Sequence, residues 1–336
     1  MDCNSSDRAA LVKIKEQLGN PPELSSWLPA TNCCAWDNTI VCSETGRVYL
    51  VALFRLNVTA PITSAYGDLP MLQTIQLDTM PGLYGPIPSS FAKLSHLELL
   101  DITGTQVSGP IPDFLVKTNL SALTITNRKL TEHIPQYLSK VLNSGLRAIV
   151  VYSGSYSGRF KTLYLSRLSN LRYIDLSSNM LSGTIPPGLL HGSFRFLILS
   201  NNMLTGQIPE DYAYGDIDTI DLSHNQLTGD PSFLFGTAKP MTKIDLSWNE
   251  LEFDMTKVRF PYHLTYLDLS HNHIKGGVSK FLKDIKLGHF NVSYNDLCGK
   301  IPTGRFMIYH GADSYVHKCL CGTPLPPLQE TRVANN

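Results

Sequence analysis

The chain has 336 residues, and its 28 lysine and arginine residues balance its 28 aspartate and glutamate residues. This balance excludes a strongly basic protein that would bind nucleic acid without regard to sequence. No apolar stretch reaches the roughly 18 to 20 residues of a membrane span, and no charged and then apolar leader precedes Asp2, so we expect no membrane span. If the protein is secreted, its signal peptide is not part of this chain.

Residues 1–46 are predicted to form an N-terminal cap with an amphipathic helix. Side chains from Asn4 to Asp7 can cap the start of a helix, and Gly19 is a natural place for it to end. One face of this helix is apolar and can cover the next element: Ala10, Leu11, Ile14 and Leu18.

A repeated frame follows the cap. It reads L-x-x-L-x-L-x-x-N-x-L, and in its later copies the asparagine recurs at intervals of 23, 23, 24, 23 and 23 residues. An asparagine amide has two donors and an acceptor on a short stem, so stacked asparagines can satisfy backbone groups that a tight turn would bury unpaired. This frame is that of the leucine-rich repeat. The asparagines are therefore scaffold: Asn179, Asn202, Asn225, Asn249, Asn272 and Asn295.

Ten to eleven repeats are predicted over residues 47–303, followed by a C-terminal cap and tail over 304–336. Several repeats carry an Ile-Pro pair preceded by a glycine, as at Gly85 and Gly206. Proline suits an extended edge or a turn, and glycine suits positive φ. We therefore expect an α/β repeat solenoid, a right-handed leucine-rich-repeat superhelix with a parallel concave β-sheet, short convex strands, 3₁₀ turns and disulfide-stapled caps.

The cysteines gather at the two ends of the array, four in the N-terminal cap and three near the C-terminus. The first and last coils of a solenoid expose core, so disulfides there would suit a protein made in an oxidising compartment. Four N-x-S/T sequons agree with a secretory route and an extracellular glycoprotein. The predicted glycosylation sites are Asn4, Asn57, Asn119 and Asn291.

Three features carry a family resemblance. They are the extended frame L-x-x-L-x-L-x-x-N-x-L-x-G-x-I-P, the cap run Cys33-Cys34-Ala35-Trp36, and the end run from Phe290 to Pro302 with Cys319-Leu320-Cys321-Gly322. On these features, residues 3–326 resemble the plant polygalacturonase-inhibiting proteins. The chain departs from the family pattern where coils 4 and 5 lose the frame, at Thr126-Asn127-Arg128 and Ser153-Gly154-Ser155, and where the usual final cysteine is absent.

The resemblance implies a secreted, monomeric cell-wall protein of plant defence. It implies binding of fungal or insect endopolygalacturonase through the concave face, binding of pectin as well, and no cofactor. It also implies three disulfides and leaves Cys321 without its family partner. The implied pairs are Cys3–Cys33, Cys34–Cys42 and Cys298–Cys319.

Position 5 of the frame points to the concave face and holds aspartate in several coils. Because neighbouring strands lie about 4.8 Å apart, these carboxylates form a row of like charge. They are either the default strand residue of this repeat or an anionic strip for a cationic partner. An enzyme that holds a polyanion needs a basic cleft, which such a strip would match. The row comprises Asp221, Asp245 and Asp268, and the predicted partner-binding set also includes Asp175 at the same frame position.

Position 8, at the strand exit, holds large groups in the last coils, and position 3 holds Lys243 and Tyr266. Surface aromatic residues are enriched among binding hot spots, whereas stacking between coils is the structural alternative. The predicted partner-binding set therefore also includes Lys243 and Tyr266 from position 3. From position 8 it includes His224, Trp248 and His271.

Position 2 places Arg147, Arg172 and Arg195 in three successive coils. A guanidinium group offers two planar donors to a carboxylate, so this row is the candidate pectin-binding site. The alternative is an ordinary solvated face.

We find no catalytic or metal-binding constellation in the sequence. The run Gly154–Gly158 has tyrosine where a nucleophile elbow needs serine. His317, Cys319 and Cys321 could imitate a metal site, but cysteines in a secreted cap are better explained as disulfide partners. We therefore expect a binding protein and not an enzyme. Two alternatives to an inhibitor remain, a receptor-like module for a peptide or partner ectodomain and an ice- or wall-polymer-binding derivative.

Overall fold

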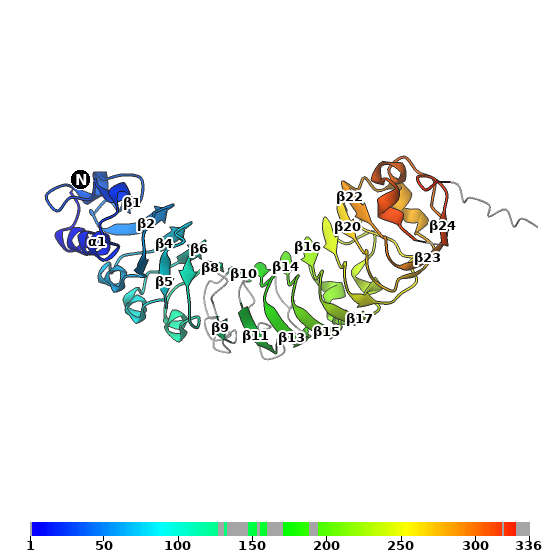
Figure 1. Cartoon of the computed structure of the whole chain (residues 1–336), viewed down its shortest axis with the longest axis horizontal. Helices are drawn as coiled ribbons and strands as arrows, with labels where there is room; N and C mark the ends of the chain where they lie inside the picture. The colour runs from blue at the N-terminus through cyan, green and yellow to red at the C-terminus, as the bar shows by residue number, and fades with distance from the viewer. Residues whose placement is uncertain are drawn as a thin grey trace, which may run out of the picture. The chain divides into compact units, whose positions relative to one another are not determined.

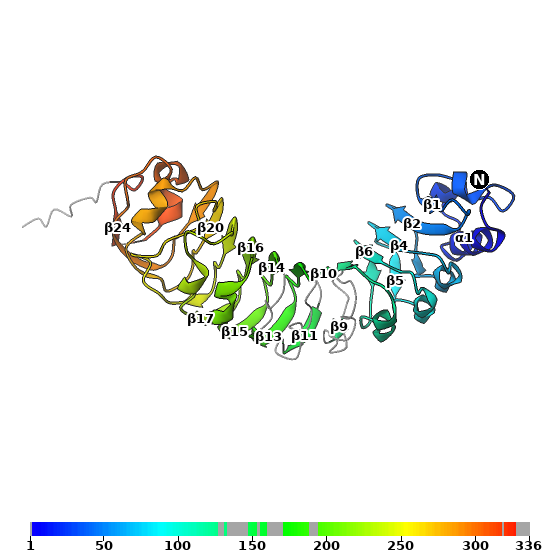
Figure 2. The same ribbon diagram turned by 180° about the vertical axis from the view of Figure 1, so that it is seen from behind.

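The structure, a computed structural model, describes residues 2–126, 131–132, 147–152, 155–159, 171–187, 194–317 and 319–326. The chain divides into two compact units. Unit 1 comprises Met1–Ser182 and His191–Ser193, and unit 2 comprises Gly183–Leu190 and Phe194–Asn336. Figures 1 and 2 show the elements of each unit from opposite sides.

Unit 1 begins with a helix that is linked by an ion pair and hydrogen bonds to the start of the second strand. α1 (Ser5–Gln17) starts after Asn4, whose side chain caps the first turn. Asp7 is fully buried, and its carboxylate accepts hydrogen bonds of 2.9 Å from the Arg47 guanidinium and from the backbone N–H of Val48. This ion pair raises the pKa of Arg47. The cap helix is therefore held to the sheet by charge as well as by its buried apolar face.

The main sheet of unit 1 has one strand per coil. Its first pair is antiparallel and the later strands pair in parallel and in register. The order is β1 (Ile40–Cys42), β2 (Val48–Phe54), β4 (Thr74–Asp78), β6 (Leu99–Thr103), β8 (Ala122–Thr126), β10 (Ala148–Tyr152) and β12 (Tyr173–Asp175). The predicted irregular segments 126–128 and 153–155 lie largely outside the described residues.

Short strands and 3₁₀ turns complete the coils of unit 1. The strands are β3 (Ala60–Pro61), β5 (Leu83–Gly85), β7 (Gln106–Val107), β9 (Thr131–Glu132) and β11 (Ser155–Arg159), and β13 (Met180–Thr184) follows at the end of the unit. The 3₁₀ turns are η1 (Pro22–Leu24), η2 (Cys33–Ala35), η3 (Ser64–Asp68), η4 (Ser89–Lys93) and η5 (Asp113–Lys117).

Unit 2 repeats the plan. Its main parallel strands are β14 (Phe196–Ile198), β16 (Thr219–Asp221), β18 (Lys243–Asp245), β20 (Tyr266–Asp268) and β22 (His289–Asn291). Its shorter strands are β15 (Met203–Gln207), β17 (Gln226–Gly229), β19 (Glu250–Leu251), β21 (Lys275–Gly276), β23 (Asp296–Lys300) and β24 (Cys319–Cys321). The 3₁₀ turns are η9 (Glu210–Tyr214), η10 (Ser232–Leu234), η11 (Lys280–Asp284), η12 (Met307–His310) and η13 (Ala312–Tyr315).

The asparagine ladder predicted from the repeat is present. In unit 2, Asn249 Nδ2 donates to the carbonyl of Leu222 in the preceding coil at 3.0 Å and to that of Leu246 in its own coil at 3.2 Å. Its Oδ1 accepts from the backbone N–H of Leu227 at 2.9 Å. Asn225 and Asn272 make equivalent contacts. The prediction that these amides satisfy buried backbone groups is confirmed, and the ladder is scaffold.

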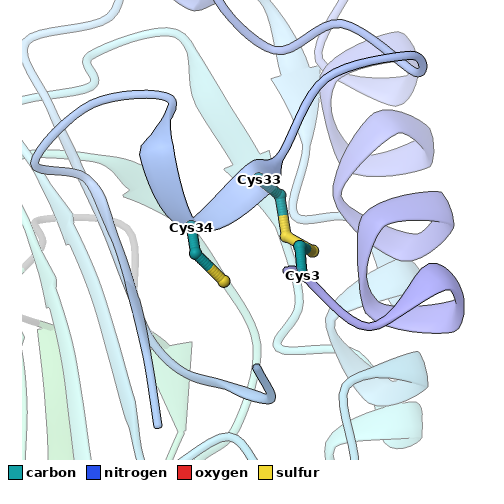
Figure 3. Close-up of side chains that lie close together, drawn as sticks. All are labelled: Cys3, Cys33 and Cys34. Atoms are coloured by element: carbon teal, nitrogen blue, oxygen red, sulfur yellow. A yellow bond between two sulfur atoms is a disulfide. The ribbon is translucent and has the colours of Figure 1, made fainter. Parts of the chain in front are cut away.

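Disulfides join the cysteines in the pattern that the resemblance implied. The bonds are Cys3–Cys33, Cys34–Cys42 and Cys298–Cys319, and Cys321 is free. Figure 3 shows Cys34 beside the first of these bonds. The sulfurs of Cys3, Cys33 and Cys34 lie within 4.8 Å of one another, but two of them are bonded together. This cluster is therefore a pair of neighbouring disulfides rather than a set of free thiolate ligands.

Candidate functional site

The strands β16, β18, β20 and β22 present alternate side chains on one side of the sheet, which we call the open face of unit 2. It carries positions 3 and 5 of the frame, while Ile244 and Leu267, which follow position 3, are completely buried on the other side. The alternation follows from the two-residue period of a strand. The predicted partner-binding residues of unit 2 at positions 3 and 5 therefore share one surface.

In unit 2, each position-5 aspartate stabilises the turn at the exit of its own strand. Asp245 Oδ1 accepts from the hydroxyl and the backbone N–H of Ser247 at 2.7 and 3.2 Å. Asp268 makes the same pair of bonds to Ser270 at 2.6 and 3.0 Å. An aspartate that bonds two residues ahead stabilises a turn. Asp221 in this row and Asp175 in unit 1 do the same.

In unit 2, the Oδ2 atom of each position-5 aspartate contacts the side chain at position 3 of the next coil. Asp221 Oδ2 lies 3.1 Å from Lys243 Nζ, and Asp245 Oδ2 accepts from the Tyr266 hydroxyl at 3.2 Å. Asp268 Oδ2 lies 3.0 Å from Nε2 of His289. Each of these three carboxylates therefore has a hydrogen-bond or ion-pair partner in the following coil.

The row is less accessible than an open anionic strip would be, and its role in binding stays a prediction. Asp245 and Asp268 are each only 8% exposed, so both are buried. Burial raises the pKa of Asp245, the charge of Asp221 raises it further, and the hydrogen bonds from Ser247 oppose the shift. Burial and the charges of Asp245 and Asp268 also raise the pKa of Tyr266, which keeps its hydroxyl protonated as a donor. These aspartates position other side chains more than they offer contacts themselves.

Position 3 forms a continuous column over the buried aspartates. Lys243 Nζ lies 4.9 Å from the centroid of the Tyr266 ring, and that ring stacks on His289 with centroids 4.2 Å apart. A cation over a ring face is attracted by the ring quadrupole. His289 was not among the residues predicted from the sequence. It holds the same frame position in the last coil, so extending the frame by one coil would have identified it.

Position 8 forms a second column, which we call the ring ladder. It comprises His224, Trp248, His271 and Tyr294, each with φ between 53° and 55°. Ring centroids are 5.3 Å apart between His224 and Trp248, 3.6 Å between Trp248 and His271, and 4.2 Å between His271 and Tyr294. All three contacts are stacked. Backbone in the left-handed region turns these residues out of the strand period, so the sequence-based alternation does not describe them.

The ring ladder is both packed and exposed. Trp248 is 49% exposed and Tyr294 is 55% exposed. Neighbouring rings of the ladder cover one another's faces, and part of each of these two rings remains open to solvent. Burial lowers the pKa of His271, and His224 adds to this effect while Asp268 opposes it, so His271 is mainly neutral near neutral pH. The predicted stacking between coils is therefore confirmed, while partner binding by these exposed rings stays a prediction.

The predicted arginine row falls in both units. Arg147 and Arg172 are exposed in neighbouring coils of unit 1, where the backbone N–H of Arg172 donates to the carbonyl of Arg147 at 2.9 Å. Arg195 is exposed in unit 2. The row is thus solvent-accessible at each of its three positions.

The sequons lie in different environments. Asn57 and Asn119 are exposed, whereas Asn4 caps α1. Asn291 lies at position 5 on the open face, and its Oδ1 accepts from the Ser293 hydroxyl at 2.8 Å. A glycan at Asn291 would therefore stand on the open face itself.

Comparisons with known proteins agree with this architecture. Residues 4–43 match a model described as a leucine rich repeat N-terminal domain, and residues 170–191, 193–214 and 263–277 match models described as leucine rich repeats. With its parallel strands, 3₁₀ turns and disulfide-bonded N-terminal cap, the chain is a leucine-rich-repeat solenoid. Within the described residues, no helix is long and apolar enough to span a membrane.

The relatives are more specific. Polygalacturonase inhibitor 1 of Oryza sativa subsp. japonica is 44% identical over 96% of this chain and 90% of its own length, and the protein of the same name from Arabidopsis thaliana is 38% identical over 96% and 92%. The chain belongs to the polygalacturonase inhibitor family.

Solved structures share the fold. The structure of a plant ice-binding protein is 36% identical with a TM-score of 0.78, and the match covers 98% of this chain and 100% of that one. The ectodomain of the Arabidopsis thaliana receptor kinase GASSHO1/SCHENGEN3 is 28% identical with a TM-score of 0.76, and the match covers 88% of this chain but only 36% of the receptor chain.

Proposed function

We propose that the chain is a secreted, monomeric cell-wall protein that inhibits a fungal or insect endopolygalacturonase by binding it through the open face and ring ladder of unit 2. The names of its relatives supply the enzyme class. The observation that carries the choice of surface is the exposed ladder centred on Trp248. Rings that are already stacked lose little conformational freedom on binding, and large aromatic residues are enriched among interface hot spots.

The charges beneath the rings suit a basic partner. Asp221, Asp245 and Asp268 outnumber the one lysine of this face, Lys243, so the surface stays acidic when its histidines are neutral. An enzyme that holds polygalacturonate must attract a polyanion, and its cleft is therefore expected to be basic. The aspartates then act through their field on the rate of association. Contacts at short range come from Lys243, from Tyr266 and from the ladder.

A test of the proposal measures reducing-sugar release from polygalacturonate by several fungal and insect enzymes, with and without the protein. Inhibition of at least one enzyme is expected. Tyr294→Arg should then abolish inhibition by adding bulk and charge at the ladder, whereas Tyr262→Arg, at an exposed position in the loop before β20, should not. If Tyr294→Arg still inhibits as strongly as Tyr262→Arg and the unaltered protein, the binding surface lies elsewhere.

We also propose that the arginine row binds pectin, the polymer whose carboxylates suit guanidinium donors. Replacing Arg147, Arg172 and Arg195 together by glutamine should remove retention on a pectate column at low salt, since several weak ionic contacts are screened together. Unchanged retention would leave these side chains as an ordinary solvated face.

A further inference from the structure

The N-terminal cap places a third cysteine sulfur beside a buried disulfide. The inner bond, Cys3–Cys33, has almost no contact with solvent, because Cys3 is only 7% exposed and Cys33 is completely buried. The outer bond, Cys34–Cys42, joins two half-buried residues, so a small thiol has access to it. The sulfurs of Cys3, Cys33 and Cys34 lie within 4.8 Å of one another (Figure 3). The inner bond is therefore closer to Cys34 than to any reagent in solution.

Asn32 holds two of these cysteines together without the help of a disulfide. Its Oδ1 accepts a hydrogen bond from the backbone N–H of Cys3 at 2.9 Å and another from that of Cys34 at 3.1 Å. The backbone N–H of Asn4 also donates to the carbonyl of Gly46 at 2.9 Å, which attaches the N-terminal segment a second time. None of these contacts involves sulfur. Cys3 and Cys34 therefore remain neighbours when the outer bond is opened.

This arrangement permits two successive exchange steps. A thiolate that attacks one sulfur of a disulfide forms a new bond to it and expels the other sulfur as a thiolate. When a small thiolate attacks Sγ of Cys42, a mixed disulfide forms there, the outer bond breaks and Cys34 leaves as a thiolate. Cys34 can then attack Sγ of Cys3. The Cys3–Cys34 bond forms, the Cys3–Cys33 bond breaks, and Cys33 leaves as a thiolate that takes a proton from water.

The chain geometry favours Cys3 over Cys33 as the target of the second step. Attack on Cys33 would join adjacent residues, whose Cα atoms lie about 3.8 Å apart across a trans peptide, below the roughly 4.4 to 6.8 Å of ordinary disulfides. Attack on Cys3 joins the two residues that Asn32 already holds together. The exchange therefore moves the N-terminal segment from Cys33 to Cys34, and the segment stays covalently linked to η2.

We propose that Cys42 is a modification site for a low-molecular-weight thiol such as glutathione, and that transfer of Cys3 from Cys33 to Cys34 retains the thiol there. A mixed disulfide on Cys42 alone would be short-lived, because the Cys34 thiolate released beside it would attack it and restore the outer bond. Once Cys34 is bonded to Cys3, it can no longer reverse the first step. The modification remains reversible by excess thiol, and it does not depend on inhibition of an enzyme.

The test uses the full chain with Cys321→Ser, which removes the free thiol near the C-terminus and leaves both bonds of the N-terminal cap unchanged. The protein is incubated with glutathione, quenched with acid and treated with N-ethylmaleimide to block its free thiols. Peptide mapping without reduction, with fragment-ion sequencing to distinguish the adjacent cysteines, then locates each group. We expect glutathione on Cys42, the blocking group on Cys33 and a Cys3–Cys34 bond.

A matched control replaces Cys34 and Cys42 together by serine in the same background. It keeps the inner bond and lacks the thiol that would attack it. The blocking group should then appear on Cys33 at least about tenfold more slowly, because an internal thiolate acts at a high effective concentration that dissolved glutathione does not reach. Equal rates in the two proteins would show that glutathione opens the inner bond directly, and would overturn the proposal.

The mapped position of the blocking group decides the proposal even if the control does not fold. Glutathione on Cys42 with the blocking group on Cys34 and an intact Cys3–Cys33 bond overturns it, because the outer bond then opens without transfer. Absence of glutathione from Cys42 overturns it as well. Only the transferred pairing, with glutathione on Cys42, supports it.

Discussion

Replacing Trp248 with alanine separates the packing of the ring ladder from its contact with a partner. Trp248 is 49% exposed, so about 100 Å² of a side chain of about 200 Å² is covered in the free protein and a similar area remains for a partner. At about 25 cal/mol per Å², each half corresponds to at most about 2.5 kcal/mol. We therefore expect the free energy of unfolding to fall by up to that amount. Affinity for the enzyme should fall by up to roughly 70-fold.

A side chain outside the core would be expected to add little to stability, and the structure changes that expectation. The Trp248 ring lies 3.6 Å from the ring of His271, so truncation removes contacts in the free chain as well. Urea denaturation gives the stability change, and surface plasmon resonance gives the dissociation rate, which should increase. Tyr262→Ala is the matched control at an exposed ring outside the ladder. A stability loss with affinity within twofold of the unaltered protein would show that the ring serves packing alone.

Two further predictions follow from the aspartates. Asp245→Ala should lower the free energy of unfolding by about 1 to 3 kcal/mol, because it leaves Ser247 without its acceptor. Asp245→Asn should lower it much less, since Asn291 makes the same turn in another coil. Urea denaturation measures both changes. For Asp101, the folded-state pKa is raised above its ordinary 3.8, so the ionised group destabilises the fold above that folded value. The stability advantage of Asp101→Asn should therefore be present at about pH 7 and disappear as the pH falls through the folded pKa towards about pH 3, and an advantage that grows on acidification would refute this sign.

Much of the scaffold could be predicted because it is periodic. The spacing of Asn225, Asn249 and Asn272 predicted the ladder of amides, and the two-residue period of the strands predicted which residues are buried. Ile244 and Leu267 are buried as the frame requires. Both inferences need only contacts between residues at equivalent places in successive coils.

The candidate site was harder to predict because its contacts join different frame positions of successive coils. Asp221 contacts Lys243 and Asp268 contacts His289, pairs in which position 5 of one coil meets position 3 of the next. Local sequence shows an aspartate in a strand but does not show whether the next coil offers a donor. For the same reason Asp101, which meets Ala122, resembles the other aspartates in sequence and differs from them in environment.

The left-handed backbone at position 8 has a consequence for how this surface can evolve. Thr79, Ser178, Asn201 and Trp248 all occupy it with φ between 53° and 55°, so one turn geometry accepts side chains of very different size. Substitution there changes what a coil displays without changing how the coil is built. In-frame duplication of a segment of one repeat would likewise insert one new display position while neighbouring coils kept their hydrogen-bond register. The set of side chains on this surface can therefore diversify by unequal recombination as well as by point mutation.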